Sequence, residues 1–296
     1  AHGTDNSVTG SISDQTGADT PAGVEDTVYV TLTNNDSADE ADGATLNHLV
    51  SLVDKDGNPV SLAAGQTVTV NLTYTNDDTE SADFGASKVT QVTITGPANS
   101  ADVINTIADD YLAEGVEGYT LSIGSIVDNA GAFEQIQAHG TDNSVTGSIS
   151  DQTGADTPAG PEDTVYVRLL TDDSASEGDQ LTHTVQLVDK DGNPVTVAAG
   201  ESITVTIAYG PAQSGDSATA GDDYTATTSV VIGAGTSSAS VIVNTTNDVF
   251  AENSESYTAT ATAAVQANGT YEQVAVDTIN NSVTGTIVEN DSNNTP

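Results

Sequence analysis

The chain has 296 residues, of which 44 are acidic and four are basic, and its formal net charge at pH 7 is −40. This charge excludes nucleic acid and anionic membranes as partners, because both require a basic surface. The chain contains no cysteine, which excludes the disulfides that stabilise many small secreted domains. Four cations cannot neutralise so many carboxylates, so salt or bound divalent metal must supply the counter-charge.

The opening segment Ala1–Gly23 occurs again without change as Ala138–Gly160, and its NSVTG run returns a third time at Asn281. A period of about 137 residues is too long for a solenoid repeat and suits an independently folding domain. We therefore predict two tandem domains, residues 1–149 and 150–296. The opening residues match the interior of the repeat, so we expect an excerpt from a longer array, with any targeting signal outside it.

Short runs in which apolar and polar residues alternate follow one another in chain order between turn signals. In the second repeat we expect strands over residues 164–170, 182–188, 202–209, 224–232, 238–245, 256–265 and 271–279. The first repeat contains similar runs, such as TVYVTLT and TVTVNLTY. Alternation of apolar and polar residues with a period of two is typical of half-buried strands, and Val and Thr favour strands. We predict an all-β protein of two tandem antiparallel β-sandwiches in an extended rod.

The run VDKDGNPV begins at Val53 and again at Val188. Its alternating Asp54, Asp56 and Asn58 suggest an EF-hand, but Gly57 is the fourth residue of that loop and Gly65 the twelfth, where an EF-hand needs Gly at the sixth and Glu at the twelfth. Asp-Gly between two apolar runs instead indicates a tight turn.

Acidic residues of the second repeat follow a spaced pattern. Asp223 and Tyr224 precede a strand, a glycine turn at 233–235 and a second strand, and then come the acidic positions and an aromatic: Asn247, Asp248, Glu252, Glu255 and Tyr257. The pattern resembles the Calx-beta motif, which implies an immunoglobulin-like sandwich that binds calcium. The first repeat follows it less closely, and its matching residues are Asp83, Phe84, Asp109, Asp110, Glu114, Glu117 and Tyr119.

The chemistry of these positions favours calcium on its own grounds. Calcium takes six to eight hard oxygen ligands in flexible geometry, whereas magnesium needs a strict octahedron. Zinc and copper prefer His or Cys ligands, and the chain has four scattered His and no Cys. We expect Ca²⁺ as the bound ion, although a solvated acidic surface remains open for any single carboxylate.

A second acidic set lies in and around the repeated segment. Its members precede the first strand of each repeat or follow the NSVTG run: Asp14, Glu25, Asp26, Asp142, Asp151, Glu162, Asp163 and Glu289. If NSVTG is the last strand of each sandwich, these residues lie at a domain junction. Calcium held there would stiffen a linker that is otherwise flexible. A plain solvated linker remains the alternative, because recent duplication copies idle residues too.

Signs of catalysis are weak. A glycosidase usually needs paired carboxylates and aromatics for sugar stacking, and the chain has no Trp and only three Phe. His48 and His183 occupy equivalent positions without a nucleophile motif nearby, and we expect them to be surface or edge-strand residues. We therefore expect no enzyme.

The acidic, cysteine-free tandem repeats resemble the extender region of giant bacterial repeats-in-toxin (RTX) adhesins. The resemblance implies type I secretion to the extracellular bacterial surface, where calcium stiffens the repeats so that they project a distal binding domain for adhesion and biofilm formation. We expect a monomer whose partners are calcium and neighbouring repeats, without membrane insertion in this segment. The alternative is a glycan- or protein-binding module, favoured by the rewritten hairpin around 96–101 in the first repeat.

Overall fold

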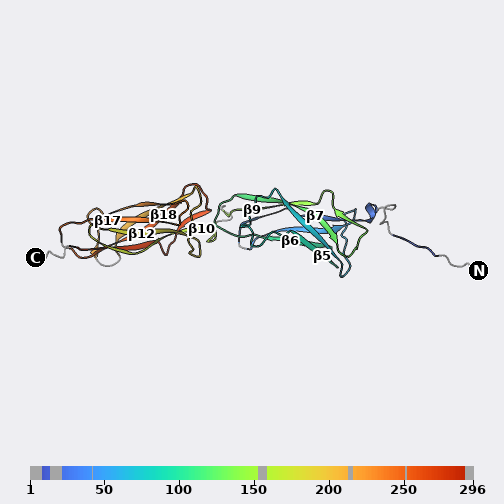
Figure 1. Ribbon diagram of the computed structural model, residues 1–296, viewed down its shortest axis with the longest axis horizontal. Coiled ribbons are helices and arrows are strands. Elements are labelled where there is room, and N and C mark those ends of the chain that lie inside the picture. Colours follow the sequence, from blue (N-terminus) through green and yellow to red (C-terminus); the bar gives the residue numbers. More distant parts are fainter. Residues whose placement is uncertain are drawn as a thin grey trace, which may run out of the picture. The chain divides into compact units, whose positions relative to one another are not determined.

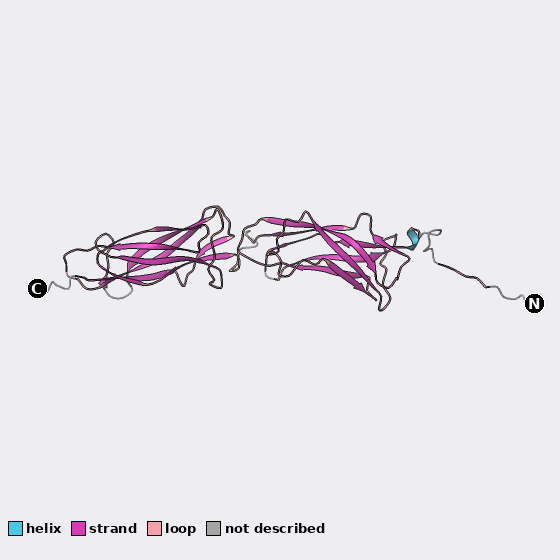
Figure 2. Cartoon of the chain, in the orientation of Figure 1, coloured by secondary structure: helices cyan, strands magenta, loops and turns pink. Residues whose placement is uncertain are grey.

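The computed structural model describes residues 9–13, 22–41, 43–152, 159–212, 216–250 and 252–290. Regular structure in these ranges is almost entirely strand, apart from a short 3-10 turn over Val24–Asp26 (Figure 2). The prediction of an all-β fold is therefore confirmed. No helix in these ranges has the length and apolar character needed to cross a membrane.

The chain forms two compact units, each with its own hydrophobic core. The first unit comprises Ala1–Ala108 and Gly115–Ser150, and the second comprises Asp109–Glu114 and Asp151–Pro296. Blue to green strands in Figure 1 belong to the first unit, and yellow to red strands to the second. The short segment Asp109–Glu114 thus belongs with the second unit, although strands of the first unit precede and follow it.

The first unit is a sandwich of two sheets, with strand orders β6-β3-β1-β8 and β2-β9-β7-β4-β5. Buried side chains alternate with exposed ones along the strands, as in the eBeBe pattern of β5. Each sheet therefore turns one face to the shared core. The strands are β1 Thr27–Thr33, β2 Asp36–Asp39, β3 Thr45–Val53, β4 Thr67–Thr75, β5 Gln91–Thr95, β6 Ser100–Thr106, β7 Val116–Asp128, β8 Gln135–Ala138 and β9 Ser144–Ser150.

The second unit repeats this plan, with strand orders β15-β17-β12-β10-β19 and β11-β20-β18-β13-β16, while β14 pairs with β18 outside that path. The strands are β10 Thr164–Leu170, β11 Asp173–Ser176, β12 Gln180–Val188, β13 Ser202–Pro211, β14 Asp216–Ser217, β15 Tyr224–Ala226, β16 Ser229–Gly233, β17 Ser238–Thr245, β18 Glu255–Gln266, β19 Gln273–Val276 and β20 Ser282–Val288. Strands expected over 164–170 and 238–245 match β10 and β17, whereas the run 224–232 is divided between β15 and β16.

Both sandwiches differ from the predicted antiparallel pattern at their edges. β1 pairs with β8 in parallel, β10 pairs with β19 in parallel, and β2 and β11 pair in parallel with β9 and β20. In the first unit the parallel pairs arise because the chain over residues 135–150 changes sheet. It first adds β8 to the edge of the sheet beside β1, and then crosses to the other sheet as β9, beside β2. Short added strands of this kind cover sheet edges that would otherwise be open.

The histidines of β3 and β12, which are equivalent strands of the two units, are buried, so the expectation of surface or edge positions was wrong. His48 and His183 are 1% and 0% exposed and lie on inner strands of their sheets. Nε2 of His48 lies 2.9 Å from the hydroxyl of Tyr119, and Nε2 of His183 lies 2.8 Å from that of Tyr257. Each pair satisfies two polar groups inside the core, which the sequence pattern around these residues did not indicate.

The turn predicted from VDKDGNPV is present in both units. In the first, the backbone amide of Asp54 donates to the carbonyl of Asn58 at 2.9 Å, and Oδ1 of Asp54 accepts from the amides of Asp56 and Asn58. Gly57 has φ +84°, which favours glycine. In the second unit Asp189 makes the same contacts with Asp191 and Asn193.

Candidate metal centre in the second unit

Five predicted ligand positions of the second unit lie at strand ends. Asp223 immediately precedes β15, Asp248 follows β17, Glu252 and Glu255 lead into β18, and Glu289 follows β20. Tyr224 pairs with Thr245 and Glu255 pairs with Ile287 in the sheet ladders. These pairings bring one end of several strands together, because residues matched across a ladder lie about 5 Å apart.

The carboxylates converge in space. Oxygen atoms of Asp223, Glu252 and Glu255 all lie within 4.8 Å of one another. The backbone amide of Glu252 donates to Oε2 of Glu289 at 2.6 Å, and the amide of Phe250 donates to Oδ1 of Asp248 at 2.7 Å. A hollow of about 510 Å³ is lined by Asp222, Asp223, Asp248, Glu252 and Glu255. The described structure therefore gathers Asp223, Asp248, Glu252 and Glu255, which belong to one sequence pattern. It adds Glu289, which the sequence analysis placed with the junction residues.

The electrostatics of this group are unfavourable without a counter-ion. Burial, a hydrogen bond with Asp223 and the charges of Asp223, Glu252 and Asp216 together raise the pKa of Glu255 to about 7. Burial and the charges of Asp223, Asp248 and Glu289 raise the pKa of Glu252 as well. A carboxylate among other carboxylates loses its proton only at higher pH, since each added negative charge repels the next.

The basic side chains of the unit form ion pairs with other carboxylates. Nε of Arg168 lies 2.6 Å from Oδ2 of Asp277, and Nζ of Lys190 lies 3.4 Å from Asp191. Arg168 and Lys190 are the only Lys or Arg in this unit. A hard divalent cation would fit the site, because it carries charge that the chain itself lacks and accepts several carboxylate oxygens at once.

In the first unit, two of the predicted ligands lie close together. Carboxylate oxygens of Asp83 and Glu117 lie within 4.8 Å of each other. Asp83 is only 3% exposed, and its Oδ2 accepts from the amide of Glu80 at 2.6 Å. Oδ1 of Asp83 is buried without a hydrogen-bond partner among the described residues. Such an atom is costly to bury unless a further group satisfies it.

The segment Asp109–Glu114 carries three predicted ligands into the second unit. Asp110 accepts from the amide of Leu112 at 2.7 Å, and the amide of Glu114 donates to Oδ1 of Asp151 at 3.2 Å. This contact matches the one between Glu252 and Glu289, because Asp151 and Glu289 each follow the strand that begins with SVTG.

Several other predicted ligands have partners of another kind. Oδ2 of Asp142 lies 3.3 Å from Nδ1 of His139, and Oε1 of Glu162 lies 3.8 Å from Nζ of Lys190. Oδ2 of Asp26 accepts from the amide of Gly23 at 2.9 Å, and the neighbouring Glu25 is exposed. Asp14 lies outside the described residues.

Acidic residues that the sequence patterns missed also contribute. Asp222 lines the hollow and Asp216 raises the pKa of Glu255. Glu272 is a further case, because burial and neighbouring carboxylates raise its pKa to about 8. Comparison of the repeats offered a signal for Glu272, since Glu134 follows Phe133 as Glu272 follows Tyr271.

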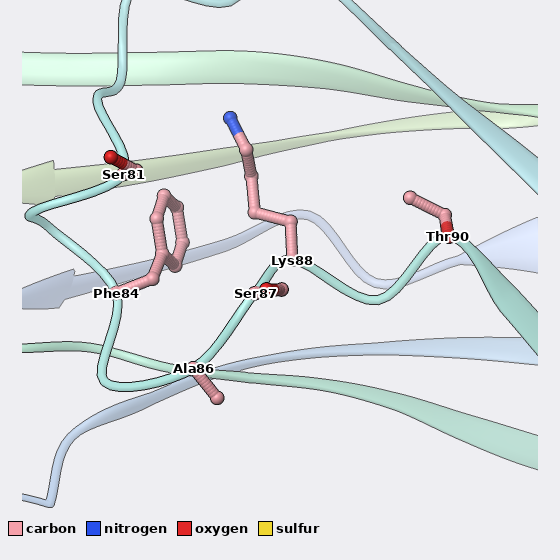
Figure 3. Close-up of a pocket in the computed structure, with 6 residues that line it drawn as sticks. All are labelled: Ser81, Phe84, Ala86, Ser87, Lys88 and Thr90. Atoms are coloured by element: carbon pink, nitrogen blue, oxygen red, sulfur yellow. The ribbon is translucent and has the colours of Figure 1, made fainter.

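A separate pocket of about 450 Å³ lies in the first unit beside β5 (Figure 3). The side chain of Lys88 extends next to the ring of Phe84, with Nζ 5.2 Å from the ring centroid (Figure 3). The same Nζ lies 2.5 Å from Oδ2 of Asp77 and 3.0 Å from Oγ1 of Thr79. Burial acts to raise the pKa of Asp77, but the contacts with Lys88 and Thr79 outweigh it and lower that pKa.

Comparisons with known proteins add limited information. No protein-family model and no curated protein matches the chain. Among solved structures, the calcium binding domain CBD12 of CALX1.1 aligns at 11% identity over 88% of this chain and 99% of its own, with a TM-score of 0.32. The Calx CBD2 domain aligns at 12% identity over 42% of this chain and 86% of its own, with a TM-score of 0.31.

A third solved structure, domains 4 and 5 of the surface-layer protein SbsC, aligns at 15% identity over 88% of this chain and 97% of its own, with a TM-score of 0.26. The sandwich assignment rests on the strand pairing and the two cores described above.

Proposed function

We propose that the chain is a calcium-binding structural spacer, an extender segment of a secreted bacterial surface adhesin of the RTX kind. Its role is mechanical and not catalytic: calcium stiffens the junctions between neighbouring repeats, and the array projects a distal binding domain for adhesion and biofilm formation. The verbatim repeat and the net charge of −40 support this proposal. The chain acts as a monomer at the extracellular cell surface after type I secretion.

The proposal that the chain binds calcium rests on the convergence of the carboxylates of Asp223, Glu252 and Glu255. Asp248 and Glu289 add oxygen donors at the same strand ends. When bound, calcium supplies positive charge that allows these carboxylates to lie together ionised. The chain contributes the donors and positions them by backbone hydrogen bonds to Thr219, Phe250 and Glu252.

The test is a calcium titration of the full chain and of Asp223→Asn, followed by calorimetry and thermal unfolding. Asp223→Asn keeps the shape of the side chain and removes one charged ligand. We expect the parent to bind calcium and to gain unfolding free energy with the logarithm of its concentration, reaching about 2.7 kcal/mol at 100 times Kd. The variant should bind at least about tenfold more weakly at this site.

The matched control is Asp102→Asn, which removes the same charge from the exposed face of β6. It should leave calcium affinity unchanged, since long-range effects between exposed charges are screened by salt. Equal affinity in the parent and in Asp223→Asn would show that the convergent carboxylates do not hold the ion. Magnesium at the same concentration serves as a second control, with weaker stabilisation expected.

A ligand-binding module of the same kind of adhesin is the second candidate function, favoured by the pocket at Phe84 and Lys88. Its volume of about 450 Å³ lies within the range of small-molecule sites. Glycan-array screening in the presence of calcium distinguishes the two functions, because a pure spacer binds no glycan.

A further inference from the structure

A second acidic group lies in the second unit, where β10 and β19 begin. β10 pairs with β19 in parallel, and Thr164 is matched with Gln273 at the start of the ladder. The backbone amide of Gln273 donates to the carbonyl of Asp163 at 3.2 Å. Asp163 and Glu272 are therefore the residues that immediately precede the ladder, on two neighbouring strands.

Both carboxylates are removed from water and are poorly compensated. Asp163 is 1% exposed; its Oδ2 accepts from the amide of Gly160, but its Oδ1 has no hydrogen-bond partner among the described residues. Neither oxygen of Glu272 accepts a hydrogen bond of normal geometry from those residues, and both are buried. Burying a charged oxygen without a partner is strongly unfavourable, so we expect a further group to satisfy these oxygens.

The segment Asp109–Glu114 lies against the loop that carries Glu272. The carbonyl of Tyr111 accepts from the amide of Glu272 at 3.1 Å, and the amide of Ala113 donates to the carbonyl of Thr270 at 2.9 Å. Leu112 and Tyr271 form an isolated β-bridge. This segment is thus held by backbone bonds to the loop that carries Glu272, and Asp109 lies within it.

Besides Asp163, the carboxylates of Asp151 and Asp109 contribute negative charge near Glu272. Burial and the charges of Asp163, Asp151 and Asp109 raise the pKa of Glu272, while the nearby backbone of Gln152 acts to lower it. An oxygen of Asp151 lies within 4.8 Å of an oxygen of Glu272. Arg168 and Lys190, the only Lys or Arg of the unit, form ion pairs with Asp277 and with Glu162 and Asp191.

We propose that Asp163 and Glu272, together with Asp151 and Asp109, hold a second divalent cation of the calcium class inside this unit. The site is separate from the group around Asp223, and only its identification with calcium rests on the proposed function. Oxygen donors alone, without His or Cys, favour a hard cation over zinc or copper. The unpartnered Oδ1 of the buried Asp163 is the atom that an ion in the site would satisfy.

The first unit supplies a natural control for this site. Glu134 occupies the position of Glu272 beside Phe133, and Asp26 occupies that of Asp163. Glu134 is exposed and Asp26 is half-buried, and Oδ2 of Asp26 accepts from Gly23 at 2.9 Å. Substitution of Glu134 therefore removes the same charge from an equivalent position that water reaches.

The experiment measures bound calcium by equilibrium dialysis and calorimetry in four full-length proteins: the parent, Glu272→Gln, Glu134→Gln and Asp223→Asn. We expect Glu272→Gln to bind one ion fewer than the parent and Glu134→Gln to bind the same number. Thermal unfolding adds a second readout. In chelator above pH 8, where Glu272 is ionised, Glu272→Gln should unfold at a higher temperature than the parent, because a buried charge has been removed. Its gain in unfolding temperature on adding calcium should be smaller than that of the parent.

Asp163→Asn is the second variant and serves as the test if Glu272→Gln fails to fold. We expect it to bind one ion fewer than the parent. An unchanged number of ions and an unchanged calcium gain in Glu272→Gln would overturn the proposal and leave Glu272 as a protonated buried acid. If Glu272→Gln loses an ion and Asp223→Asn does not, the second site stands and the proposed site at Asp223 fails. If Asp223→Asn loses an ion and Glu272→Gln does not, the second site is overturned and the site at Asp223 stands.

Discussion

The glycine that ends the NSVTG run lies against a buried tyrosine ring. In the last copy, a Cβ placed on Gly285 would lie 2.1 Å from Cζ of Tyr257. In the middle copy, a Cβ on Gly147 would lie 2.4 Å from Cζ of Tyr119. Each tyrosine ring therefore packs directly over the glycine backbone. The tyrosine hydroxyl forms a hydrogen bond with Nε2 of the buried histidine of the opposite sheet.

Gly285→Ala should destabilise the second unit by about 1–3 kcal/mol, the usual cost of overpacking a core. The ring of Tyr257 cannot move away easily, because it is fully buried, stacks on Tyr224 at 4.6 Å and bonds His183. Chemical denaturation with calcium held constant measures the change in unfolding free energy.

Gly233→Ala is the matched control, since a Cβ there meets nothing within 4 Å. It should change stability by less than about 0.5 kcal/mol. Equal effects of the two substitutions would contradict the assignment of Gly285 as a packing requirement.

At the scale of elements, Glu201 joins the start of β13 to the connection between β18 and β19. Glu201 is 2% exposed, and its carboxylate accepts from the amides of Ser202, Ala267, Asn268 and Thr270 at distances from 2.7 to 3.2 Å. Burial acts to raise its pKa, but these backbone donors outweigh it and lower the pKa from 4.5 to about 2. The carboxylate thus closes one end of the sandwich without a metal.

Glu201→Gln should lower the unfolding free energy of the second unit at pH 7 by roughly 1.5–3 kcal/mol, the range for hydrogen bonds to charged groups. The folded pKa lies below the unfolded one, so this stabilisation is present above pH 4.5 and is lost as the pH falls towards 2. The difference between the variant and the parent should therefore shrink over that interval in urea titrations at a series of pH values.

Asp102→Asn again provides the control, because Asp102 is exposed on β6. Its effect on stability should stay within about 0.5 kcal/mol at each pH. A Glu201→Gln difference that does not change between pH 7 and pH 2 would argue against a charged carboxylate at this position.

At the scale of the whole molecule, the net charge of −40 makes counter-ions part of the folded state. Sodium acts on such a surface by screening, with a Debye length of about 10 Å at 0.1 M. Calcium held by grouped carboxylates acts by specific binding instead, which monovalent salt does not reproduce.

Small-angle scattering of the chain should therefore give a larger and more uniform maximum dimension in calcium than after chelation. A sodium chloride solution of the same ionic strength is the control and should not restore the calcium profile. Identical profiles in calcium, in chelator and in matched sodium chloride would leave the acidic residues as solvated surface and remove the support for a calcium-stiffened spacer.

The amino-acid pattern by itself determined the all-β class and most strand positions, and it placed Asp223, Asp248, Glu252 and Glu255 in one group. These features depend on local signals: alternation of period two, turn residues, and acidic residues placed at strand ends. Glu289 was expected at a junction, and only the structure places it at Glu252. The parallel pairs of β8, β19, β2 and β11 were missed because each joins residues more than one hundred positions apart, as Thr27 with Gln135.

Only the tertiary structure decided which polar residues are buried. His48 and His183 lie in the core because each meets a tyrosine hydroxyl from the facing sheet, and nothing near them in the sequence indicates that partner. Glu272, in the loop before β19, resembles an exposed acid until Asp109–Glu114 bonds to that loop and Asp163 lies beside it. Burial and electrostatic fields arise from all neighbours in space, so the pattern of one segment cannot determine them.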